Sequence, residues 1–554
     1  MARMTGGEAL AKQLAIEGVK VIFGVPGVQL YGALAGLRDE GKIRFITTRH
    51  EQSTSYMADG YARASGEVGV ALVVPGPGLY NAAAGLSTAY SASSPVLMIC
   101  GQVPRAQIGK DIGVLHEINE QLDAIKPVTK WRKRVLQVHE VPGLVHEAFE
   151  QLRTGRPRPV EIEMPPDTME EEGDAELLPP STAERKAASA SEIDRAAELL
   201  LAARNPVLYA GGGVALGGAH EVVAALAEYL QCGVAMSPEG KGAVSDHSDL
   251  SLGAGFWTKS RLRRYIESCD LVLAVGTRLA LAPFPPEMKV VHLDIDGDEI
   301  GRNYKNSVGL VGDAKKTLVA LLERLRRAAP ARASRKGERE ALRAEIVEDG
   351  RQQPQDGITK SLRAGVPEDA IFVGDMTQIG YYARPFWPVY QPGTFFTSSY
   401  SGNLGYGYPF ALGTKVARPN KAVVAACGDG GFMYNCQELS TAVKDKINVV
   451  VVVFNDSAFG NVARDLDEAW GGEWNSKLVN PDFVKFAESF GVTAMRAKDP
   501  TDVGGLVKDA IQLDRPVLID VPVGRMPRPN FFAPRRAPAK YQKYALGRQE
   551  IKEG

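Results

Sequence analysis

The chain has 554 residues, 44% of them hydrophobic, and a formal net charge of −1. This length is typical of three or four domains with buried cores. The small net charge gives no field that would hold nucleic acid or an anionic membrane, and no run of about eighteen apolar residues could span a bilayer. The five cysteines, an odd number, favour a reducing compartment. They form no CxxC or Cys/His cluster that would suggest a zinc site. Since the first residues lack the apolar core of a signal peptide, we expect a cytoplasmic protein.

The first predicted domain covers residues 1–170 and places a carboxyl group at the end of a strand. Residues 42–48 are predicted as a strand, 49–52 as its end, 53–64 as a helix and 68–74 as the next strand. Pro75-Gly76-Pro77-Gly78 then forms a tight turn. Glu51 therefore lies beside a glycine-rich turn, in a position suited to proton exchange with a ligand. The alternative is a surface glutamate in an ordinary strand–helix loop.

The middle of the chain is predicted as a second sheet domain, residues 191–330, between polar linkers at 171–190 and 331–354. Residues 205–213, 271–276 and 290–296 have the pattern of strands followed by tight turns in an open nucleotide-binding type of sheet. Neither a complete Gly-x-Gly-x-x-Gly nor a Walker loop is present. The glycines at 211–213 are therefore explained either by a nucleotide or by tight turns around an empty site.

The third predicted domain, residues 355–530, contains two acidic loops that should meet. Residues 421–427 and 449–454 are predicted as buried strands, joined by a helix over 437–446. Parallel strands with a right-handed crossover end at the same sheet edge, so Asp429 and Asp456 should lie together. Carboxylates beside glycines suit a hard cation that bridges a diphosphate. The alternative is a loop-facing aspartate without a ligand.

These motifs resemble those of a known enzyme family. Gly428-Asp429-Gly430 followed by Asn455-Asp456 resembles the cofactor motif of thiamine-diphosphate-dependent enzymes, in which the last position is Asn. Residues 49–52, 57–66 and 76–78 closely resemble the acetolactate synthase and benzaldehyde lyase superfamily. The resemblance implies an α/β protein with three open, mainly parallel domains: pyrimidine-binding, central and diphosphate-binding. It also implies thiamine diphosphate, Mg²⁺ and a homodimer or homotetramer, since family members build each site from two chains.

The same resemblance implies roles for individual residues. Glu51 would protonate N1′ of the aminopyrimidine and so activate C2 of the thiazolium. Asp429, Asp456 and the carbonyl oxygen of Ala458 would bind the metal. Leu404 would support the bent cofactor, and the carbonyl of Gly402 would accept a hydrogen bond from its 4′-amino group. The further candidates for cofactor binding are Pro26, Gly27, Asp375, Thr377, Gly428, Gly430, Gly431 and Phe459.

The substrate pocket departs from the acetolactate synthase pattern. Asp465 occupies the place of a Trp, Leu115-His116-Glu117 replaces Phe-Gln-Glu, and Leu79-Tyr80 replaces Ala-Thr. Residues 115–131 are more similar to benzaldehyde lyase and other acyloin-cleaving or carboligating relatives, which argues against an anabolic acetolactate synthase. His116 and His50 are candidate proton shuttles, or imidazoles that only satisfy backbone groups. The residues predicted to shape the pocket are Val28, Gln29, Tyr80, His116, Tyr381 and Asn461.

We therefore predict a lyase or transferase that cleaves or forms a C–C bond next to a carbonyl. The expected reactions are 2-oxo acid decarboxylation with carboligation, or acyloin cleavage to an aldehyde. Two alternatives are an FAD-dependent pyruvate-oxidase-like oxidoreductase and a non-catalytic subunit. The resemblance implies that domains related to the central one bind FAD, ADP or no nucleotide. Residues 279–282 differ from the sequence found at this place in the FAD-binding members of the family. Residues 525–543, which extend into the predicted tail 531–554, would form either a lid or a solvated tail.

Overall fold

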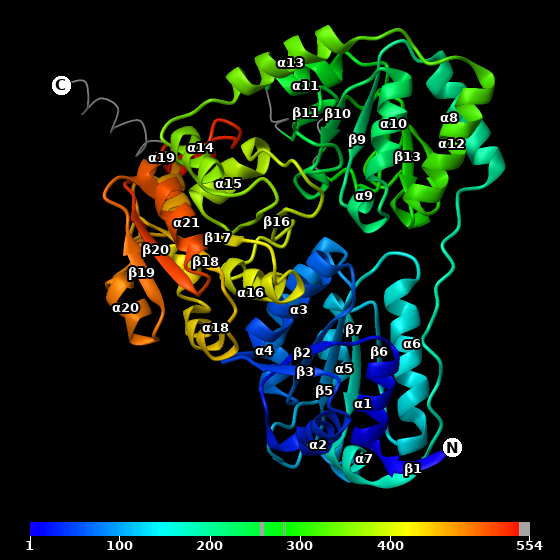
Figure 1. Cartoon of the computed structure of the whole chain (residues 1–554), viewed down its shortest axis with the longest axis vertical. Helices are drawn as coiled ribbons and strands as arrows, with labels where there is room; N and C mark the ends of the chain where they lie inside the picture. Colours follow the sequence, from blue (N-terminus) through cyan, green and yellow to red (C-terminus); the bar gives the residue numbers. More distant parts are fainter. Residues whose placement is uncertain (255–259, 281, 283, 542–554) are drawn as a thin grey trace. The chain divides into compact units, whose positions relative to one another are not determined.

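The computed structural model describes residues 1–254, 260–280, 282 and 284–541, and it contains three six-stranded parallel sheets (Figure 1). The prediction of three open α/β domains is confirmed. A two-stranded antiparallel pair joins β1 (Ala2–Thr5) to β8 (Glu172–Ala175). Among the residues that the structure describes, no helix has the length and apolar character needed to cross a membrane.

The N-terminal sheet has the strand order β3-β2-β4-β5-β7-β6, and all its pairings are parallel. Its strands are β2 (Val21–Gly24), β3 (Arg44–Thr47), β4 (Gly69–Val73), β5 (Val96–Gly101), β6 (Trp131–Arg134) and β7 (Val160–Met164). The main helices beside it are α1 (Gly6–Ile16), α2 (Tyr31–Glu40), α3 (Glu51–Ser65), α4 (Pro77–Ala92) and α6 (Val141–Arg153).

Alternation along the strands of this sheet divides its helices between two faces. Ile22 and Leu72 pack in one core cluster with Leu10 of α1 and Phe149 of α6. Phe23, the neighbour of Ile22, points to the opposite face and meets the ring of Tyr61 of α3 at a centroid distance of 6.1 Å. Helix α3, which begins with Glu51, is therefore fixed by packing against the sheet.

The central sheet has the order β11-β10-β9-β12-β13-β14 and is also parallel. Its strands are β9 (Pro206–Ala210), β10 (Val234–Met236), β11 (Ser251–Gly253), β12 (Leu271–Val275), β13 (Val290–Asp294) and β14 (Ser307–Val311). Its longest helices are α8 (Ala190–Ala202), α10 (His220–Leu230) and α12 (Ala314–Ala328), followed by α13 (Lys336–Asp349).

The third sheet has the order β16-β15-β17-β18-β20-β19. Its strands are β15 (Ile371–Gly374), β16 (Phe395–Thr397), β17 (Val423–Gly428), β18 (Val450–Asn455), β19 (Thr493–Arg496) and β20 (Val517–Pro522). Its helices include α14 (Gln355–Gly365), α15 (Gln378–Phe386), α19 (Gly460–Trp470), α20 (Phe483–Ser489) and α21 (Val503–Gln512). β17 and β18 are parallel neighbours, as the valine-rich sequence predicts.

The chain forms two compact units that do not follow the sequence order. The first unit consists of Met1–Arg185, Ser398–Val423 and Asn435–Val449. It therefore takes α16 (Gly407–Ala417) and α18 (Leu439–Asp445) from the later part of the sequence. The second unit contains the rest of the described residues, including Val424–Tyr434 with the short helix α17 (Asp429–Phe432).

Candidate active site

Glu51 is the first residue of helix α3, which corrects the expectation that residues 49–52 end a strand and the helix begins at residue 53. The helix starts two residues earlier because His50 caps it: the ring Nδ1 of His50 accepts a hydrogen bond from the backbone N–H of Gln52, 3.1 Å away. This contact places the His50 ring proton on Nε2. The structural alternative for His50, satisfaction of a backbone group, is thus observed.

The side chain of Glu51 lies between a neutral amide and a glycine. Asn81 of α4 donates a hydrogen bond from Nδ2 to Oε2 of Glu51 at 3.0 Å. The other oxygen, Oε1, lies 3.7 Å from the point where Gly78 would carry a Cβ. The turn before α4 therefore leaves space beside the carboxyl group. Sequence reasoning missed Asn81, whose only signal is its place one helical turn after the Gly-Pro-Gly motif.

His116 and Gln29, both predicted pocket residues, contact each other. Nδ1 of His116 lies 3.2 Å from Oε1 of Gln29, and Nε2 of Gln29 donates to the carbonyl oxygen of Leu115 at 3.1 Å. His116 has a left-handed backbone with φ of +65°. A Cβ on Gly76 would lie 2.4 Å from the carbonyl oxygen of His116, so only glycine fits there. His116 is thereby held against the turn that adjoins Glu51.

The predicted cofactor residues Pro26 and Gly27 follow β2 directly, at the C-terminal edge of the N-terminal sheet. A Cβ on Gly27 would lie 2.2 Å from Cγ1 of Val74, which ends the adjacent strand segment. Buried Gln121 fixes the same region, because its Oε1 accepts from the backbone N–H of Gly76 and its Nε2 donates to the carbonyl of Gly101, both at 3.0 Å. Sequence reasoning did not identify this role of Gln121.

The segment with Gly402 and Leu404 belongs to the same compact unit as Glu51. Gly402 has φ of +65°, a conformation that favours glycine. Asn403, between the two predicted residues, donates from Nδ2 to the carbonyl of Ala84 at 2.7 Å and to Oγ of Ser87 at 3.1 Å. Both partners lie on α4, the helix that carries Asn81. One helix thus positions both the Glu51 side chain and the Gly402 turn.

Asp429 and Asp456 lie together, as the crossover between β17 and β18 predicts. Their carboxyl groups are close enough to share a hydrogen bond. Burial, and next the charge of Asp429, raise the pKa of Asp456 to about 7, while burial raises the pKa of Asp429. Two facing carboxylates require either a proton or a cation between them. Among the residues that the structure describes, no group of three or more His, Cys, Asp or Glu side chains is arranged to hold a metal ion.

Asn480 orients this acidic pair and was missed by sequence reasoning. Its Nδ2 donates to Oδ2 of Asp429 at 2.6 Å and to Oδ1 of Asn455 at 3.0 Å. The side-chain oxygen of Asn455 therefore already accepts a hydrogen bond from Asn480. Asn480 lies after α19, in a loop with the sequence Asn480-Pro481-Asp482. This sequence predicts a turn but gives no indication of a contact with Asp429.

The backbone after Asp456 is tightly folded around its carboxyl group. The N–H of Ala458 donates to Oδ1 of Asp456 at 3.2 Å, and Ser457 has φ of +54°. A Cβ on Gly460 would lie 2.2 Å from Oδ2 of Asp456. A Cβ on Gly430 would lie 2.7 Å from the ring of Phe459. These glycines therefore permit the close approach of the two loops that carry Asp429 and Asp456.

The predicted diphosphate loop lies beside the same strand ends. The N–H of Asp375 donates to the carbonyl of Ala426 at 3.0 Å, and Oδ1 of Asp375 accepts from the N–H of Met376 at 2.7 Å. Thr377 approaches Gly428, where an added Cβ would lie 3.3 Å from the Thr377 Cβ. Gly431 is buried in α17. Asp375, Thr377, Gly428 and Asp429 are thus brought to one sheet edge.

The remaining pocket candidates divide between the two units. Val28 and Tyr80 belong to the first unit and are about half exposed. Tyr381 and Asn461 belong to the second unit. Tyr381 is buried against the ring of Phe532, with centroids 5.2 Å apart, and Asn461 accepts a hydrogen bond from Arg464.

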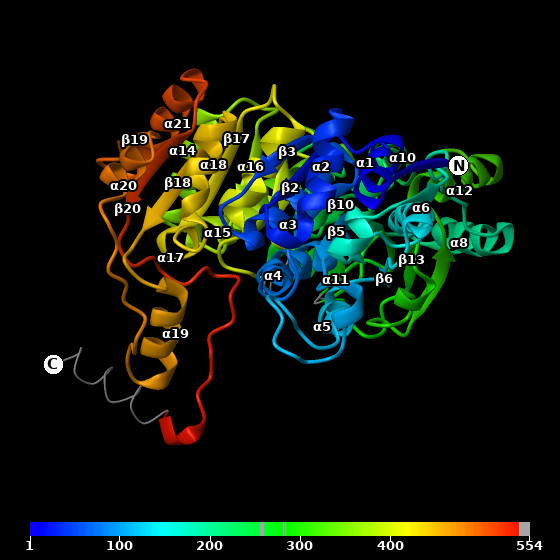
Figure 2. The ribbon, with the colours of Figure 1, turned by 90° about the horizontal axis from the view of Figure 1, so that it is seen from below.

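The C-terminal segment up to Tyr541 packs onto α19 rather than forming a solvated tail (Figure 2). Arg525 pairs with Asp467 at 2.9 Å, and Arg528 pairs with Asp465 at 2.7 Å and with Glu468 at 2.6 Å. The ring of Tyr541 lies 5.2 Å from that of Trp470. Residues 542 and 543, also predicted as part of a lid or tail, lie outside the described residues.

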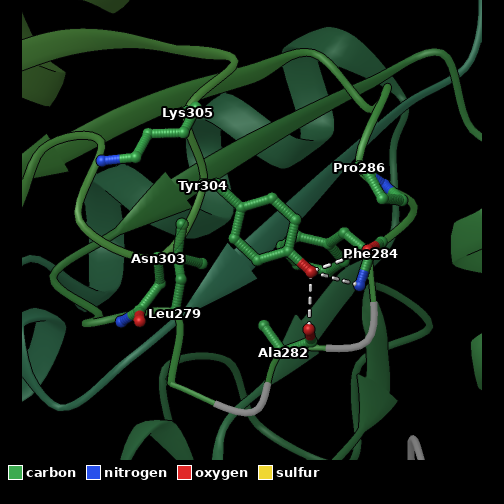
Figure 3. A pocket seen from close by; sticks show the side chains of 7 residues that line it. All are labelled: Leu279, Ala282, Phe284, Pro286, Asn303, Tyr304 and Lys305. Atoms are coloured by element: carbon green, nitrogen blue, oxygen red, sulfur yellow. Dashed lines mark hydrogen bonds between the residues drawn. The ribbon is translucent and has the colours of Figure 1, made fainter.

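The central domain accounts for its glycines by packing. Cβ atoms on Gly211 and Gly213 would lie 2.4 Å and 2.6 Å from backbone atoms of Gly276. A pocket of about 380 Å³ lies nearby in sequence, lined by Leu279, Ala282, Phe284, Pro286, Asn303, Tyr304 and Lys305 (Figure 3). The Tyr304 hydroxyl donates toward the carbonyls of Ala282 and Phe284, at 2.6 Å and 2.7 Å, and accepts from the Phe284 N–H. The Tyr304 hydroxyl, which lies at the edge of this pocket, therefore has hydrogen-bond partners within the protein.

Three protein-family models match separate regions of this chain. Residues 4–126 match the N-terminal TPP binding domain of thiamine pyrophosphate enzymes, residues 193–321 their central domain and residues 375–521 their C-terminal TPP binding domain. The loops of Asp429 and Asp456 fall within the last match. The chain belongs to the thiamine pyrophosphate enzyme family. Among members of this family, it is similar to acetolactate synthases over almost its whole length.

Three relatives in the thiamine pyrophosphate enzyme family illustrate this similarity. A probable acetolactate synthase large subunit of Methanocaldococcus jannaschii is 35% identical over 94% of this chain and 92% of its own length. The acetolactate synthase isozyme 3 large subunit of Escherichia coli is 30% identical over 94% and 95%. A probable 2-ketoarginine decarboxylase of Pseudomonas aeruginosa is 35% identical over 91% of each chain. The prediction of a member of the acetolactate synthase superfamily is confirmed.

Proposed function

We propose that this protein uses thiamine diphosphate and Mg²⁺ to form or break a C–C bond next to a carbonyl. Carboligation that follows decarboxylation of a 2-oxo acid, as in acetolactate synthases, is the main activity. The observation that carries this proposal is the facing pair Asp429 and Asp456 at the end of two parallel strands. That pair lies in the stretch matched by the C-terminal TPP binding domain.

The residues present fit the proposed cofactor. A divalent cation would replace the proton that Asp429 and Asp456 otherwise share, and Asn480 already holds Asp429 in place. The carbonyl of Ala458 is the third proposed protein ligand. The glycines at 428 and 430 leave the strand end open to a diphosphate group. Asp375 and Thr377 are proposed to line the same diphosphate site.

The chain's own groups supply proton transfer and orientation. Bound thiamine diphosphate supplies a carbon nucleophile that attacks a carbonyl and then accepts the electrons of the broken bond. Glu51 is proposed to exchange a proton with the pyrimidine end of the cofactor. Asn81 orients that carboxyl group through Oε2. His116 is proposed to move a proton at its ring, with Gln29 fixing the ring through Nδ1.

The substrate is proposed to be a 2-oxo acid, with an aldehyde, a second 2-oxo acid or an acyloin as the partner or product. The relatives are named as acetolactate synthases and a 2-ketoarginine decarboxylase, so both carboligation and simple decarboxylation are supported. Asp465, in the place of the acetolactate synthase Trp, is engaged by Arg528 at 2.7 Å. Substrate choice is therefore expected to differ from that of enzymes with the Trp.

A substrate panel tests this proposal directly. The purified protein with thiamine diphosphate and Mg²⁺ is incubated with 2-oxo acids of increasing side-chain size and with aromatic and aliphatic acyloins. We expect release of carbon dioxide and formation of an acyloin or acetohydroxy acid. Aldehyde release from acyloins alone would assign a lyase. Absence of both turnover and cofactor binding would overturn the proposal in favour of a non-catalytic subunit.

We also propose at least a homodimer, with a tetramer as the next assembly. Several large apolar side chains of the first unit are exposed, among them Val28, Tyr31, Tyr80, Ile112 and Leu115. Such a group of exposed apolar residues is typical of a protein–protein interface. Sedimentation equilibrium should give a mass of at least twice that of the chain, and a monomer that is fully active would contradict the shared site.

An FAD or ADP in the central domain is a separate proposal, made from family resemblance. Loop packing already explains Gly211 and Gly213, so the glycines do not require a nucleotide. A yellow preparation whose absorbance bleaches with substrate would support the FAD-dependent oxidoreductase. The domain limits 1–170, 191–330 and 355–530 are likewise proposed, and limited proteolysis at the linkers tests them.

A further inference from the structure

Residues 435–445 lie alongside the end of β3 and the start of α3, within the first compact unit. We call residues 435–445 the brace. The brace and residues 44–53 contact each other in opposite chain directions. The four contacts join Asp445 to Arg44, Thr441 to Thr47, Glu438 to Arg49 and Asn435 to Ser53. Glu51 lies between the last two contacts.

Glu438 is the centre of the brace. It is fully buried, and its two carboxyl oxygens accept from the backbone N–H of Arg49 at 3.0 Å and 3.2 Å. The hydroxyl of Thr441 donates to Oε2 of Glu438 at 2.6 Å. Burial raises the pKa of Glu438, whereas these hydrogen-bond donors favour its ionised form.

Asn435 holds the next turn of the same helix. Its Oδ1 accepts from the hydroxyl of Ser53 at 3.1 Å, and its Nδ2 donates to the carbonyl of Gly405 at 2.7 Å. Both Asn435 and Ser53 are buried. The brace therefore connects the first turn of α3 to the segment that contains Gly402 and Leu404.

We propose that Glu438 and Asn435 are positioning residues that fix the backbone on both sides of Glu51 and so set the direction of its carboxyl group. The local sequence of α3 is not sufficient for this, because His50 supplies its side-chain cap from a single ring nitrogen. Glu438 accepts from the backbone N–H of Arg49, two residues before Glu51, and Asn435 accepts from the side chain of Ser53, two residues after it. The functional consequence rests on the proposed role of Glu51, whereas the structural part does not.

Glu438→Gln tests the brace with little change in volume. The amide has one acceptor oxygen where the carboxylate has two, so a donor at the start of α3 loses its partner. Amide hydrogen exchange measured by mass spectrometry should be about tenfold faster in peptides that span residues 47–56. The kcat should fall while KM and thiamine diphosphate affinity stay near those of the wild type, since Glu438 touches neither ligand.

Glu17→Gln is the matched control, because Glu17 is another buried carboxylate of the same unit. It accepts from the backbone N–H of Ser181 and pairs with Arg153 at 2.7 Å. This variant should lower thermal stability without changing exchange over residues 47–56 or kcat. A milder variant, Ser53→Ala, removes only the contact with Asn435 and should give a smaller change in the same peptide.

The hydrogen-exchange and activity measurements together distinguish failure of this inference from failure of the proposed function. Wild-type exchange at the start of α3 in folded Glu438→Gln would overturn the brace whatever the activity. Faster exchange with unchanged kcat in an active enzyme would overturn the positioning of Glu51. If the wild type itself neither binds thiamine diphosphate nor turns over, the proposed function fails, and the exchange experiment still decides the structural part.

Discussion

Two sets of carboxyl groups lie shortly after parallel strands in this protein, and their surroundings differ in a way that separates two chemistries. Glu51 meets the neutral amide of Asn81, whereas Asp429 and Asp456 meet each other. A carboxyl group beside a neutral partner gains or loses a proton without breaking an ion pair. Two facing carboxyl groups are stable only with a shared proton or a cation. The first arrangement suits a proton relay and the second a metal.

The largest expected effect comes from replacing the carboxyl group of Glu51 with a group that does not ionise. Glu51→Gln keeps the shape of the side chain and a hydrogen bond to Asn81 but cannot exchange a proton. We expect kcat to fall by about 10²–10⁴-fold, the usual contribution of a positioned acid or base. Thiamine diphosphate affinity, measured by calorimetry, should change little. Glu67→Gln, just beyond the other end of α3, is the control and should retain full activity; equal loss in both variants would contradict the assignment.

The second comparison lies within the acidic pair itself. Asp429→Ala removes the residue that Asn480 orients, and Mg²⁺ affinity should fall by more than about 100-fold, beyond the effect of losing an outer partner. Asp456→Asn keeps an oxygen ligand and removes the repulsion between the two carboxylates, so we expect it to be tolerated. Retention of thiamine diphosphate during gel filtration, at increasing concentrations of chelator, measures both. If neither variant loses Mg²⁺, the metal site is elsewhere.

A smaller effect should follow from the residue that supports the pair. Asn480→Ala leaves both carboxyl groups in place but removes the donor shared by Asp429 and Asn455. Loss of such an outer partner typically lowers metal affinity by about 10–100-fold. Titration of the apoenzyme with Mg²⁺ at fixed thiamine diphosphate checks this value. An unchanged affinity would mean that the loop holds Asp429 without Asn480.

The contacts that sequence predicted correctly depend on regular structure. Four of the six residues of strand β18 are valine and β17 is its parallel neighbour, so the crossover rule brought Asp429 and Asp456 together without further information. The strands predicted at residues 42–48 and 68–74 correspond in the same way to β3 and β4 of the N-terminal sheet. The start of α3 was misplaced because the cap is an imidazole, which is not among the residues that usually signal a helix start.

The contacts that sequence could not predict join segments far apart along the chain. Asn480 follows Asp429 after helix α18, strand β18, helix α19 and a loop, and an Asn-Pro-Asp sequence signals only a turn. The brace contacts of Glu438 and Asn435 are separated from α3 by almost four hundred residues. Nothing in the local pattern of either segment specifies a partner, so these residues required the three-dimensional structure. Positioning residues are in general harder to predict than the carboxyl groups they hold.

Glu161 provides a third type of carboxyl environment and the smallest expected effect. It lies fully buried on β7, next to Glu163, and neither of its oxygens has a hydrogen-bond partner among the described residues. Burial, and next the charge of Glu163, raise the pKa of Glu161 well above its usual range, although Arg132 and Arg134 oppose this. The folded protein therefore retains a proton that the unfolded chain releases once the pH exceeds the ordinary carboxyl pKa.

This difference fixes the sign of a pH effect on stability. The folded state binds more protons than the unfolded state, so the Glu161 contribution to stability is lost as the pH rises toward the raised pKa. Glu161→Gln has no proton to lose, and its Tm relative to the wild type should therefore increase between about pH 5 and about pH 8. Each kcal/mol corresponds to about 2–4 °C in a domain of this size. Differential scanning calorimetry measures the change, and a Tm difference that is independent of pH would show that Glu161 is not the isolated acid its burial indicates.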